Sequence, residues 1–224
     1  NAVAQDTPAP AEVTAAPETE PSQVTSLSEA DETAMPGDPA AGESKAAVCA
    51  ACHGADGAGA ATGDFARLNI LTAGHMVKQL QDVKAGARQS PVMAPFVAGL
   101  DEQQMRDVSA WFAAQTAAPP APTDADPELM TLGEKLANRG DWDRYIPACH
   151  SCHGPRNQGV GDAFPALAGQ HAGYLESQLN AWRSGSRSND PLQLMLAVAE
   201  RMNDTDVKAV AAWLAAQPAN EEDP

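Results

Sequence analysis

The sequence contains few basic residues, few aromatic residues and no long apolar run. Of its 224 residues, 14 are Lys or Arg and 30 are Asp or Glu, which gives a formal net charge of −16. Proteins that bind nucleic acid need a basic face that displaces counterions, so this charge argues against a nucleic-acid partner. No run of about 18 apolar residues is present, so we expect no transmembrane segment in this chain. Aromatic residues make up only 4 % of the chain, which suggests that a group other than side chains fills part of the interior.

The acidic residues are concentrated outside two nearly neutral blocks. Residues 45–116 hold six acidic and six basic residues, and residues 129–217 hold nine acidic and eight basic residues. Residues 1–44 hold nine acidic residues and no Lys or Arg, and large apolar residues are rare there. Such a segment cannot bury enough surface to offset the entropy of ordering. We therefore expect a disordered acidic extension over 1–44, a proline-rich linker over 117–128 and an acidic tail over 218–224.

The two neutral blocks repeat one another. Three short motifs occur once in each block: Cys-x-x-Cys-His-Gly at 49–54 and 149–154, Gly-x-Arg at 86–88 and 185–187, and Trp-x-Ala-Ala-Gln at 111–115 and 213–217. Internal repeats of this kind indicate duplicated structural units. We expect two homologous domains, one in each block.

Both blocks predict helices and no sheet. Apolar residues recur three or four positions apart, as Met76, Leu80 and Val83 do, which is the spacing of one helix face. Asp101 is a favourable N-cap for a helix that buries Met105. We expect an all-α fold with roughly three main helices in each block. The helices are joined by long glycine-containing loops, which in compact domains usually surround a functional site.

The four cysteines all belong to the repeated motif, and three kinds of site use a Cys-x-x-Cys pair. A zinc ribbon has its two pairs roughly 15–20 residues apart, whereas these two pairs lie in separate repeats. A thioredoxin-like dithiol lies between a strand and a helix, and no strand is indicated here. Covalent haem attachment has Cys-x-x-Cys-His as its signature, and that signature occurs twice in matching places. We therefore favour two covalently bound haem c groups.

The spacing within each motif suits this chemistry. Thiols three residues apart on one helical turn lie on the same side, where both can reach the vinyl groups of a haem. The histidine that follows is then held beneath the iron as its fifth ligand. The residues expected to hold the haems are Cys49, Cys52 and His53 in the first block and Cys149, Cys152 and His153 in the second.

The sixth ligand decides whether an iron is open to small molecules. Met93 and Met195 are the only methionines that coincide in the two repeats, and each precedes the last helix of its block. We expect them to be the sixth ligands, which would raise the reduction potential relative to a second histidine. The alternative is that they are gap-filling core residues. His75 and His171 are expected to be ordinary residues at helix starts.

Two further segments, Phe164–Gln170 and Arg187–Pro191, complete a pattern that resembles the cytochrome c4 family. The resemblance covers residues 45–217 and implies two tandem class I cytochrome c domains related by a pseudo-twofold axis. It implies an electron carrier, not an enzyme. Its donor would be a bc1-type complex or a dehydrogenase, and its acceptor a protein such as a terminal oxidase. It further implies a periplasmic location, with the signal peptide already removed and any membrane association made through a partner.

The resemblance also assigns a role to Pro165. The carbonyl of this proline is expected to accept a hydrogen bond from Nδ1 of His153, which makes the ligand more basic. The first block has Ala66 where the second has Pro165, so the position of that carbonyl is less fixed. We therefore expect the two haems to differ in reduction potential.

Two other functions stay open at this point. One is the dihaem electron-transfer subunit of a periplasmic dehydrogenase, similar to the cytochrome subunit of flavocytochrome c sulfide dehydrogenase. The other is a haem enzyme such as a peroxidase, which would need one five-coordinate iron. The acidic segments around near-neutral blocks favour transient, electrostatically steered recognition of a partner with a basic patch.

Overall fold

The computed structural model describes residues 36–60, 63–119 and 124–219. The greater part of the predicted acidic extension and of the predicted tail lies outside the described residues. Within the described ranges the regular elements are helices, and β pairing is limited to three isolated bridges. The prediction of an all-α fold is confirmed. None of the described helices is both long and apolar enough to cross a membrane.

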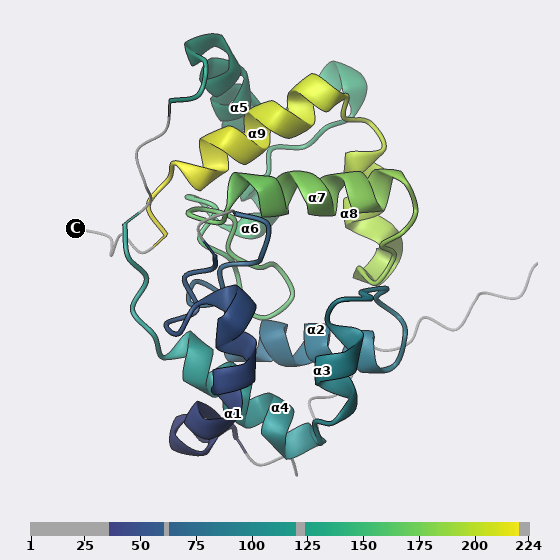
Figure 1. The fold of residues 1–224 in the computed structure, drawn as a ribbon. Helices are drawn as coiled ribbons and strands as arrows, with labels where there is room; N and C mark the ends of the chain where they lie inside the picture. The colour runs from purple at the N-terminus through teal and green to yellow at the C-terminus, as the bar shows by residue number, and fades with distance from the viewer. Residues whose placement is uncertain (1–35, 61–62, 120–123, 220–224) are drawn as a thin grey trace, which may run out of the picture. The chain divides into compact units, whose positions relative to one another are not determined.

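The described part of the first domain contains three longer helices and one short helix. These are α1 (Pro39–His53), α2 (Ala73–Lys84), α3 (Ala94–Ala98) and α4 (Glu102–Ala113), shown in Figure 1. The predicted N-cap Asp101 forms a capping box with Gln104 at the start of α4. The last turn of α1 carries the first Cys-x-x-Cys-His motif, and Gly54, with φ of 78°, ends the helix.

The second domain repeats this plan with several additional short helices. Its elements are α5 (Pro127–Arg139), η1 (Trp142–Arg144), α6 (His150–His153), α7 (Ala172–Arg183), η2 (Pro191–Gln193), α8 (Leu194–Ala199) and α9 (Asp204–Ala215). A capping box between Asn203 and Asp206 starts α9, as its counterpart starts α4. The three main helices expected in each block are α1, α2 and α4 in the first and α5, α7 and α9 in the second.

The first helix of each domain begins inside a segment that the sequence pattern assigned to the extension or the linker. Asp38 and Asp126 act as N-caps through their carboxylates, and each is followed by a proline at the first helical position. Aspartate before proline is a strong helix start signal. This Asp-Pro signal lies before the repeated motifs in the sequence. A comparison of the repeated motifs therefore does not reveal where the first helix of each domain begins.

The first and last helices of each domain pack closely. α1 packs against α4, and α5 packs against α9. An added Cβ at Gly42 would collide with the carbonyl group of Asp107, and one at Gly133 would collide with that of Ala209. Glycine therefore permits the same close helix crossing in both repeats.

The second domain has an inserted segment between α5 and its haem motif, where the first domain runs straight from α1 into the motif. Asp141 and Ile146 pair as an isolated bridge, and Ile146 is buried in the core. Arg144 fixes the insertion by pairing with Asp141 at 2.8 Å and with Asp206 of α9 at 2.6 Å. Trp142 remains 68 % exposed on this insertion.

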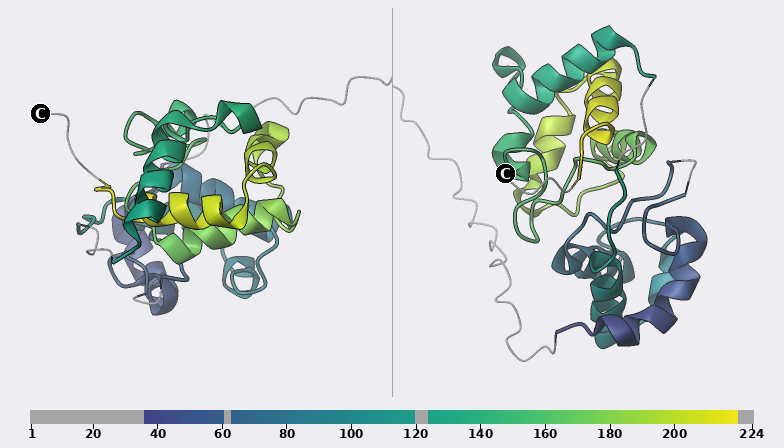
Figure 2. Two further views of the ribbon diagram at one scale, coloured as in Figure 1. Left: turned by 90° about the horizontal axis from the view of Figure 1, so that it is seen from above. Right: turned by 90° about the vertical axis from the view of Figure 1, so that its left-hand side faces the viewer.

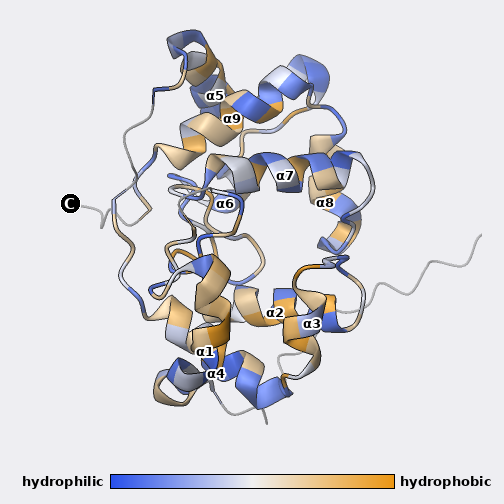
Figure 3. Cartoon of the chain, in the orientation of Figure 1, coloured by the Kyte–Doolittle hydropathy of each residue, from blue (hydrophilic) through white to orange (hydrophobic). Residues whose placement is uncertain are grey.

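Each domain has its own apolar core. In the first domain Met105 is fully buried on α4, and its counterpart in the second, Val207, is 1 % exposed. Met202 is also buried in the core of the second domain. Figure 3 shows hydrophobic residues on α1, α2 and α3, the helices of the first domain that carry the site described below.

The two domains contact each other through α2, α7 and the loops that follow the haem motifs. The right-hand view in Figure 2 shows their helices as two groups. Arg88 and its repeat counterpart Arg187 form an antiparallel bridge, which is the pairing a pseudo-twofold axis produces. An added Cβ at Gly59 would collide with the ring of His171, so the haem loop of the first domain also lies against the second domain.

Candidate functional site

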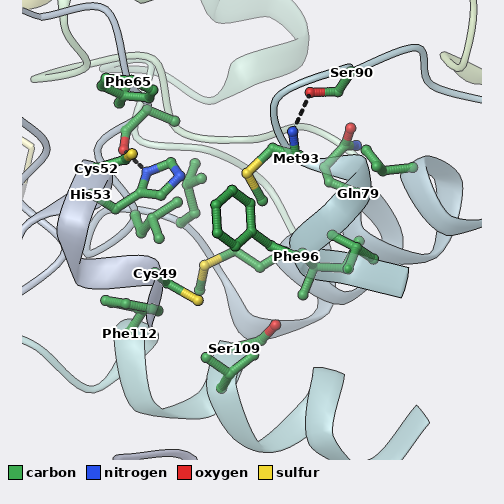
Figure 4. A pocket seen from close by; sticks show the side chains of 18 of the residues that line it. Cys49, Cys52, His53, Phe65, Gln79, Ser90, Met93, Phe96, Ser109 and Phe112 are labelled. Carbon is green, nitrogen blue, oxygen red and sulfur yellow. Dashed lines mark hydrogen bonds between the residues drawn. The ribbon is translucent and has the colours of Figure 1, made fainter. Parts of the chain in front are cut away.

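A mostly apolar cavity of about 300 Å³ lies in the first domain. Cys49, Cys52 and His53 line it from the end of α1. Met93 and Phe96 line it from α3 and the residue before it. Figure 4 shows the His53 ring and the Met93 side chain entering the cavity from different sides. The predicted haem residues of the first block are therefore brought together around one cavity.

The histidine of each motif is held by a backbone carbonyl. Nδ1 of His53 lies 2.8 Å from the carbonyl oxygen of Ala66, and Nδ1 of His153 lies 2.7 Å from that of Pro165. A carbonyl oxygen only accepts, so each Nδ1 carries the proton and each Nε2 keeps a free lone pair. Burial lowers the pKa of both imidazoles, although the carbonyl bonds partly oppose this. The rings are therefore neutral at pH 7, as a metal ligand requires.

A phenylalanine fixes the other side of each imidazole. Phe65 meets the His53 ring edge-on with centroids 6.0 Å apart, and Phe164 meets the His153 ring in the same way at 6.1 Å. Edge-to-face contacts at this separation are favourable and restrict ring rotation. Neither phenylalanine was predicted as a site residue, although each directly precedes the residue whose carbonyl holds the histidine.

The four cysteines have the spacing that haem attachment needs. All four are free of disulfide bonds. Burial raises the pKa of the Cys149 thiol to about 11 and also raises that of Cys49. Among the described residues, no group of three or more His, Cys, Asp or Glu side chains converges as a metal cluster. The zinc interpretation therefore has no ligand set in the part of the chain that is described.

The methionines predicted as sixth ligands lie at the starts of short helices and are braced by hydrogen bonds. Met93 is the N-cap of α3, and Met195 lies in the first turn of α8. Ser90 accepts a bond from the N–H of Met93 at 3.4 Å. Asp190 accepts bonds from the N–H of Met195 at 2.8 Å and from the Trp182 indole at 2.9 Å. Asp190 thus orients the backbone of the second methionine, a role that was not predicted from the sequence.

The family model described as Cytochrome c matches residues 39–115 and 131–217. The chain belongs to this family. It is 47 % identical over 170 residues to the "Thiosulfate dehydrogenase electron acceptor" of Stutzerimonas stutzeri (strain A1501), covering 76 % of this chain and 79 % of that protein.

Two solved structures match with the same TM-score of 0.74. Reduced recombinant cytochrome c4 from Pseudomonas stutzeri is 37 % identical, and the match covers 81 % of this chain and 99 % of that one. Thiosulfate dehydrogenase (TsdBA) from Marichromatium purpuratum is 38 % identical, and the match covers 81 % of this chain but only 40 % of that one. The resemblance to cytochrome c4 is confirmed. This cytochrome carries two covalently bound haem c groups, attached at Cys49 and Cys52 and at Cys149 and Cys152, and it functions in electron transfer.

The cavity of this cytochrome suits the haem of the first domain. The apolar walls match the macrocycle, the two cysteines lie at one edge, and the histidine and methionine approach from different sides. The remaining polar lining includes Gln79 and Arg88 of the first domain and Tyr174 and Gln178 of the second. The haem pocket of the first domain is therefore completed by α7 of the second domain.

His75 lies in the first turn of α2 and His171 is the N-cap of α7, as expected for helix-start residues, and both also bond across the domain border. Nδ1 of His75 lies 3.0 Å from the carbonyl oxygen of Asp162 in the second domain. Nε2 of His171 lies 2.8 Å from the carbonyl oxygen of Ala58 in the first domain. Each histidine thus bonds to the haem loop of the opposite domain, a contact that sequence spacing within one repeat cannot reveal.

Proposed function

We propose that this cytochrome accepts electrons from a periplasmic dehydrogenase that oxidises thiosulfate and passes them singly to a respiratory acceptor such as a terminal oxidase. The observation that carries the proposal is the 47 % identity to a protein named as the electron acceptor of thiosulfate dehydrogenase. The match of the same two-domain unit to 40 % of a thiosulfate dehydrogenase chain supports it. A dehydrogenase releases electrons in pairs, and a carrier with two haems can accept both before it leaves.

The protein's own residues would hold each haem closed on both faces. Haem iron supplies reversible one-electron chemistry when it is bound. In this proposal Nε2 of His53 and the sulfur of Met93 would hold the haem iron in the first domain, and His153 and Met195 would hold it in the second. Ala66 and Pro165 keep the imidazoles neutral and oriented through their carbonyl oxygens. With both axial positions filled by side chains, the protein acts as a carrier and not as an enzyme.

Location and domain limits belong to the same proposal. Covalent haem c and the named relatives favour a periplasmic protein. We place the cytochrome domains at 45–116 and 129–217, with α1 and α5 each beginning a few residues before these limits, at Pro39 and Pro127.

A second candidate donor is a respiratory bc1-type complex. The match to cytochrome c4 over 99 % of that chain favours this carrier role. A third arrangement, a permanent dehydrogenase subunit, is favoured by the fused chain that contains a similar unit. The first two candidates differ in the protein that donates electrons to the cytochrome. The third differs in the lifetime of the complex between the cytochrome and its dehydrogenase.

Stopped-flow reduction of the oxidised holoprotein tests the donor. We expect rapid haem reduction when thiosulfate and thiosulfate dehydrogenase are both added, and none with thiosulfate alone. Faster reduction by a reduced bc1-type complex would favour the second candidate. Co-elution with a catalytic chain in gel filtration of the native extract would favour a permanent subunit.

A spectroscopic measurement tests the carrier assignment itself. A pyridine haemochrome assay should give two haems per chain, and the oxidised spectrum should show sulfur bound to both irons. Fast, stoichiometric binding of cyanide or carbon monoxide at neutral pH would indicate an open iron and would contradict the assignment of the two methionines.

A further inference from the structure

A buried hydroxyl in the core of the first domain has no hydrogen-bond partner among the described residues. Ser109 lies on α4 and is 1 % exposed, and its Oγ is without a partner there. A serine inside a helix ordinarily points to solvent or bonds to the backbone carbonyl four residues earlier, and Ser109 does neither. Burying a polar group without a partner costs free energy, so this hydroxyl needs a physical explanation.

The hydroxyl belongs to the haem cavity of the first domain. Ser109 lines this cavity together with Val108 and Phe112 of the same helix. Cys49 packs from α1 against the apolar cluster that contains Val108 and Phe112. Figure 4 shows Ser109, Phe112 and Cys49 on one side of the cavity and Ser90 on the far side. Ser109 therefore lies on the side where the first haem is attached to Cys49.

The surroundings of Ser109 favour the haem over a trapped water as the missing partner. A buried water needs two to four polar partners. The neighbours of Ser109 on α4 that also line the cavity, Val108 and Phe112, are apolar. A haem that fills the cavity needs only one donor from the protein at this place.

The chemistry of the haem fixes the direction of such a hydrogen bond. The thioether edge and the ring system of a haem c offer lone pairs and π electrons but no N–H or O–H donor. A serine hydroxyl can donate or accept, so towards this group Ser109 can only donate. The positive end of its O–H dipole then points at the macrocycle.

The second domain has no hydroxyl at the matching position. The repeated Trp-x-Ala-Ala-Gln motifs begin at Trp111 and Trp213, which makes Ala211 the counterpart of Ser109. Ala211 is fully buried, and it belongs to the core cluster against which Cys149 packs. The same place beside the attachment cysteine is therefore polar in the first domain and apolar in the second.

We propose that the Ser109 hydroxyl donates a hydrogen bond to the first haem at the edge attached to Cys49, and that this bond raises the reduction potential of the first haem relative to the second. Reduction adds an electron to the haem, so the positive end of a dipole beside it stabilises the reduced state. Ser109 is not an iron ligand and acts from the core of its own domain. It shifts the distribution of a single electron towards the first haem.

Potentiometric titration of the Ser109→Ala holoprotein tests the effect on potential, with each midpoint assigned to its haem by the haem methyl signals in paramagnetic NMR. We expect the reduction equilibrium of the first haem to weaken about threefold, a fall of about 28 mV for one electron, and the second midpoint to stay unchanged. Ser109→Thr and Ser109→Val form a matched pair, since the two side chains have nearly the same shape and only threonine carries a hydroxyl. The threonine variant should keep the higher first midpoint of the two.

NMR of the reduced, diamagnetic holoprotein tests the contact itself. The Ser109 hydroxyl proton should exchange slowly with solvent and show nuclear Overhauser effects to the thioether protons at Cys49, and this signal should be missing in Ser109→Ala. An unchanged first midpoint in Ser109→Ala would overturn the proposal, as would equal falls of both midpoints. A hydroxyl proton that contacts only water would assign a trapped water as the partner and would overturn it equally.

Discussion

The side chain of Gln170 pairs with the backbone of Arg67 across the domain border. Its Oε1 accepts from the Arg67 N–H at 2.7 Å, and its Nε2 donates to the Arg67 carbonyl at 2.9 Å. Gln170 is 2 % exposed and Arg67 is 5 % exposed, so water cannot replace these bonds easily. A glutamine of the second domain therefore completes the backbone hydrogen bonding of the first.

Gln170→Ala should destabilise the protein by about 1–3 kcal/mol, because it leaves a buried N–H and a buried carbonyl without this partner. Urea unfolding of the holoprotein measures the change in the free energy of unfolding. Gln217→Ala is the matched control, since the Gln217 amide bonds locally to the Trp213 carbonyl at 2.9 Å. Equal losses in the two variants would contradict a special role for the interdomain pair.

Met93→His should lower the potential of one haem and remove its sulfur-to-iron absorption band, because imidazole favours the ferric state more than a thioether does. Optical spectra and redox titration check both changes. Met105→Leu replaces a fully buried methionine of the same domain and should leave the spectrum unchanged. A spectrum of Met93→His identical to that of the parent protein would show that another group is the sixth ligand.

Pro165→Ala should raise the potential of the second haem. A less rigid carbonyl weakens its bond to Nδ1 of His153, which makes the imidazole a poorer donor to ferric iron. Separate midpoints from NMR-monitored titration check this shift, and the first haem should not respond. Pro127→Ala, at the start of α5, is the control for loss of a proline. The prediction fails if the second midpoint falls or if both midpoints move together.

His75 makes the stability of the fold depend on pH. Burial lowers its pKa to about 4, partly opposed by the bond to Asp162 and supported by the charges of Arg187, Arg88 and Lys78. In the unfolded chain the histidine has its ordinary pKa near 6.5, so below that pH the unfolded state binds a proton that the folded state excludes. Stability contributed by the neutral ring is therefore present above about pH 6.5 and is lost as the pH falls towards 4, by up to about 3 kcal/mol.

Urea unfolding at pH 7 and pH 5 measures this dependence. His75→Gln retains a donor for the Asp162 carbonyl and removes the titrating group, so stability should fall less between the two pH values. The control is His150→Gln. In the parent protein Nε2 of His150 lies 2.9 Å from the carbonyl oxygen of Asn138, so this variant also replaces a histidine that bonds to a backbone carbonyl. An unchanged pH dependence in His75→Gln would assign the effect to other groups.

Removing residues 1–35 should weaken the ionic-strength dependence of reduction by a basic redox partner. This segment carries seven acidic residues and no Lys or Arg, and long-range attraction between opposite charges raises association rates at low salt. Stopped-flow rates at several salt concentrations provide the test. Equal salt dependence in the full and shortened proteins would show that the cytochrome domains alone steer the encounter.

The sequence predicted the parts of the site that depend on local spacing. Cys49, Cys52 and His53 share one helix turn, and Met93 was found because the second repeat has a methionine in the matching place. The all-α fold and the N-cap at Asp101 also followed from spacing of three or four residues. In each case the signal is either a short spacing within one repeat or a match between the two repeats.

The interdomain contacts could not be predicted in the same way. Arg88 and Arg187 were visible as matching residues of the repeat, but their pairing depends on how the two domains face each other. The bonds of His75 and His171 join residues 87 and 113 positions apart. Spacing within a helix carries no information about such distant partners.

The crossing of α7 into the haem pocket of the first domain has a consequence for any attempt to divide the protein. Cutting the chain near residue 120 would produce two fragments with one porphyrin each, and the N-terminal fragment would lack the phenol and amide that Tyr174 and Gln178 supply to its pocket. The two repeats are therefore not interchangeable monohaem proteins joined by a linker. They form a single redox unit whose halves are mutually dependent.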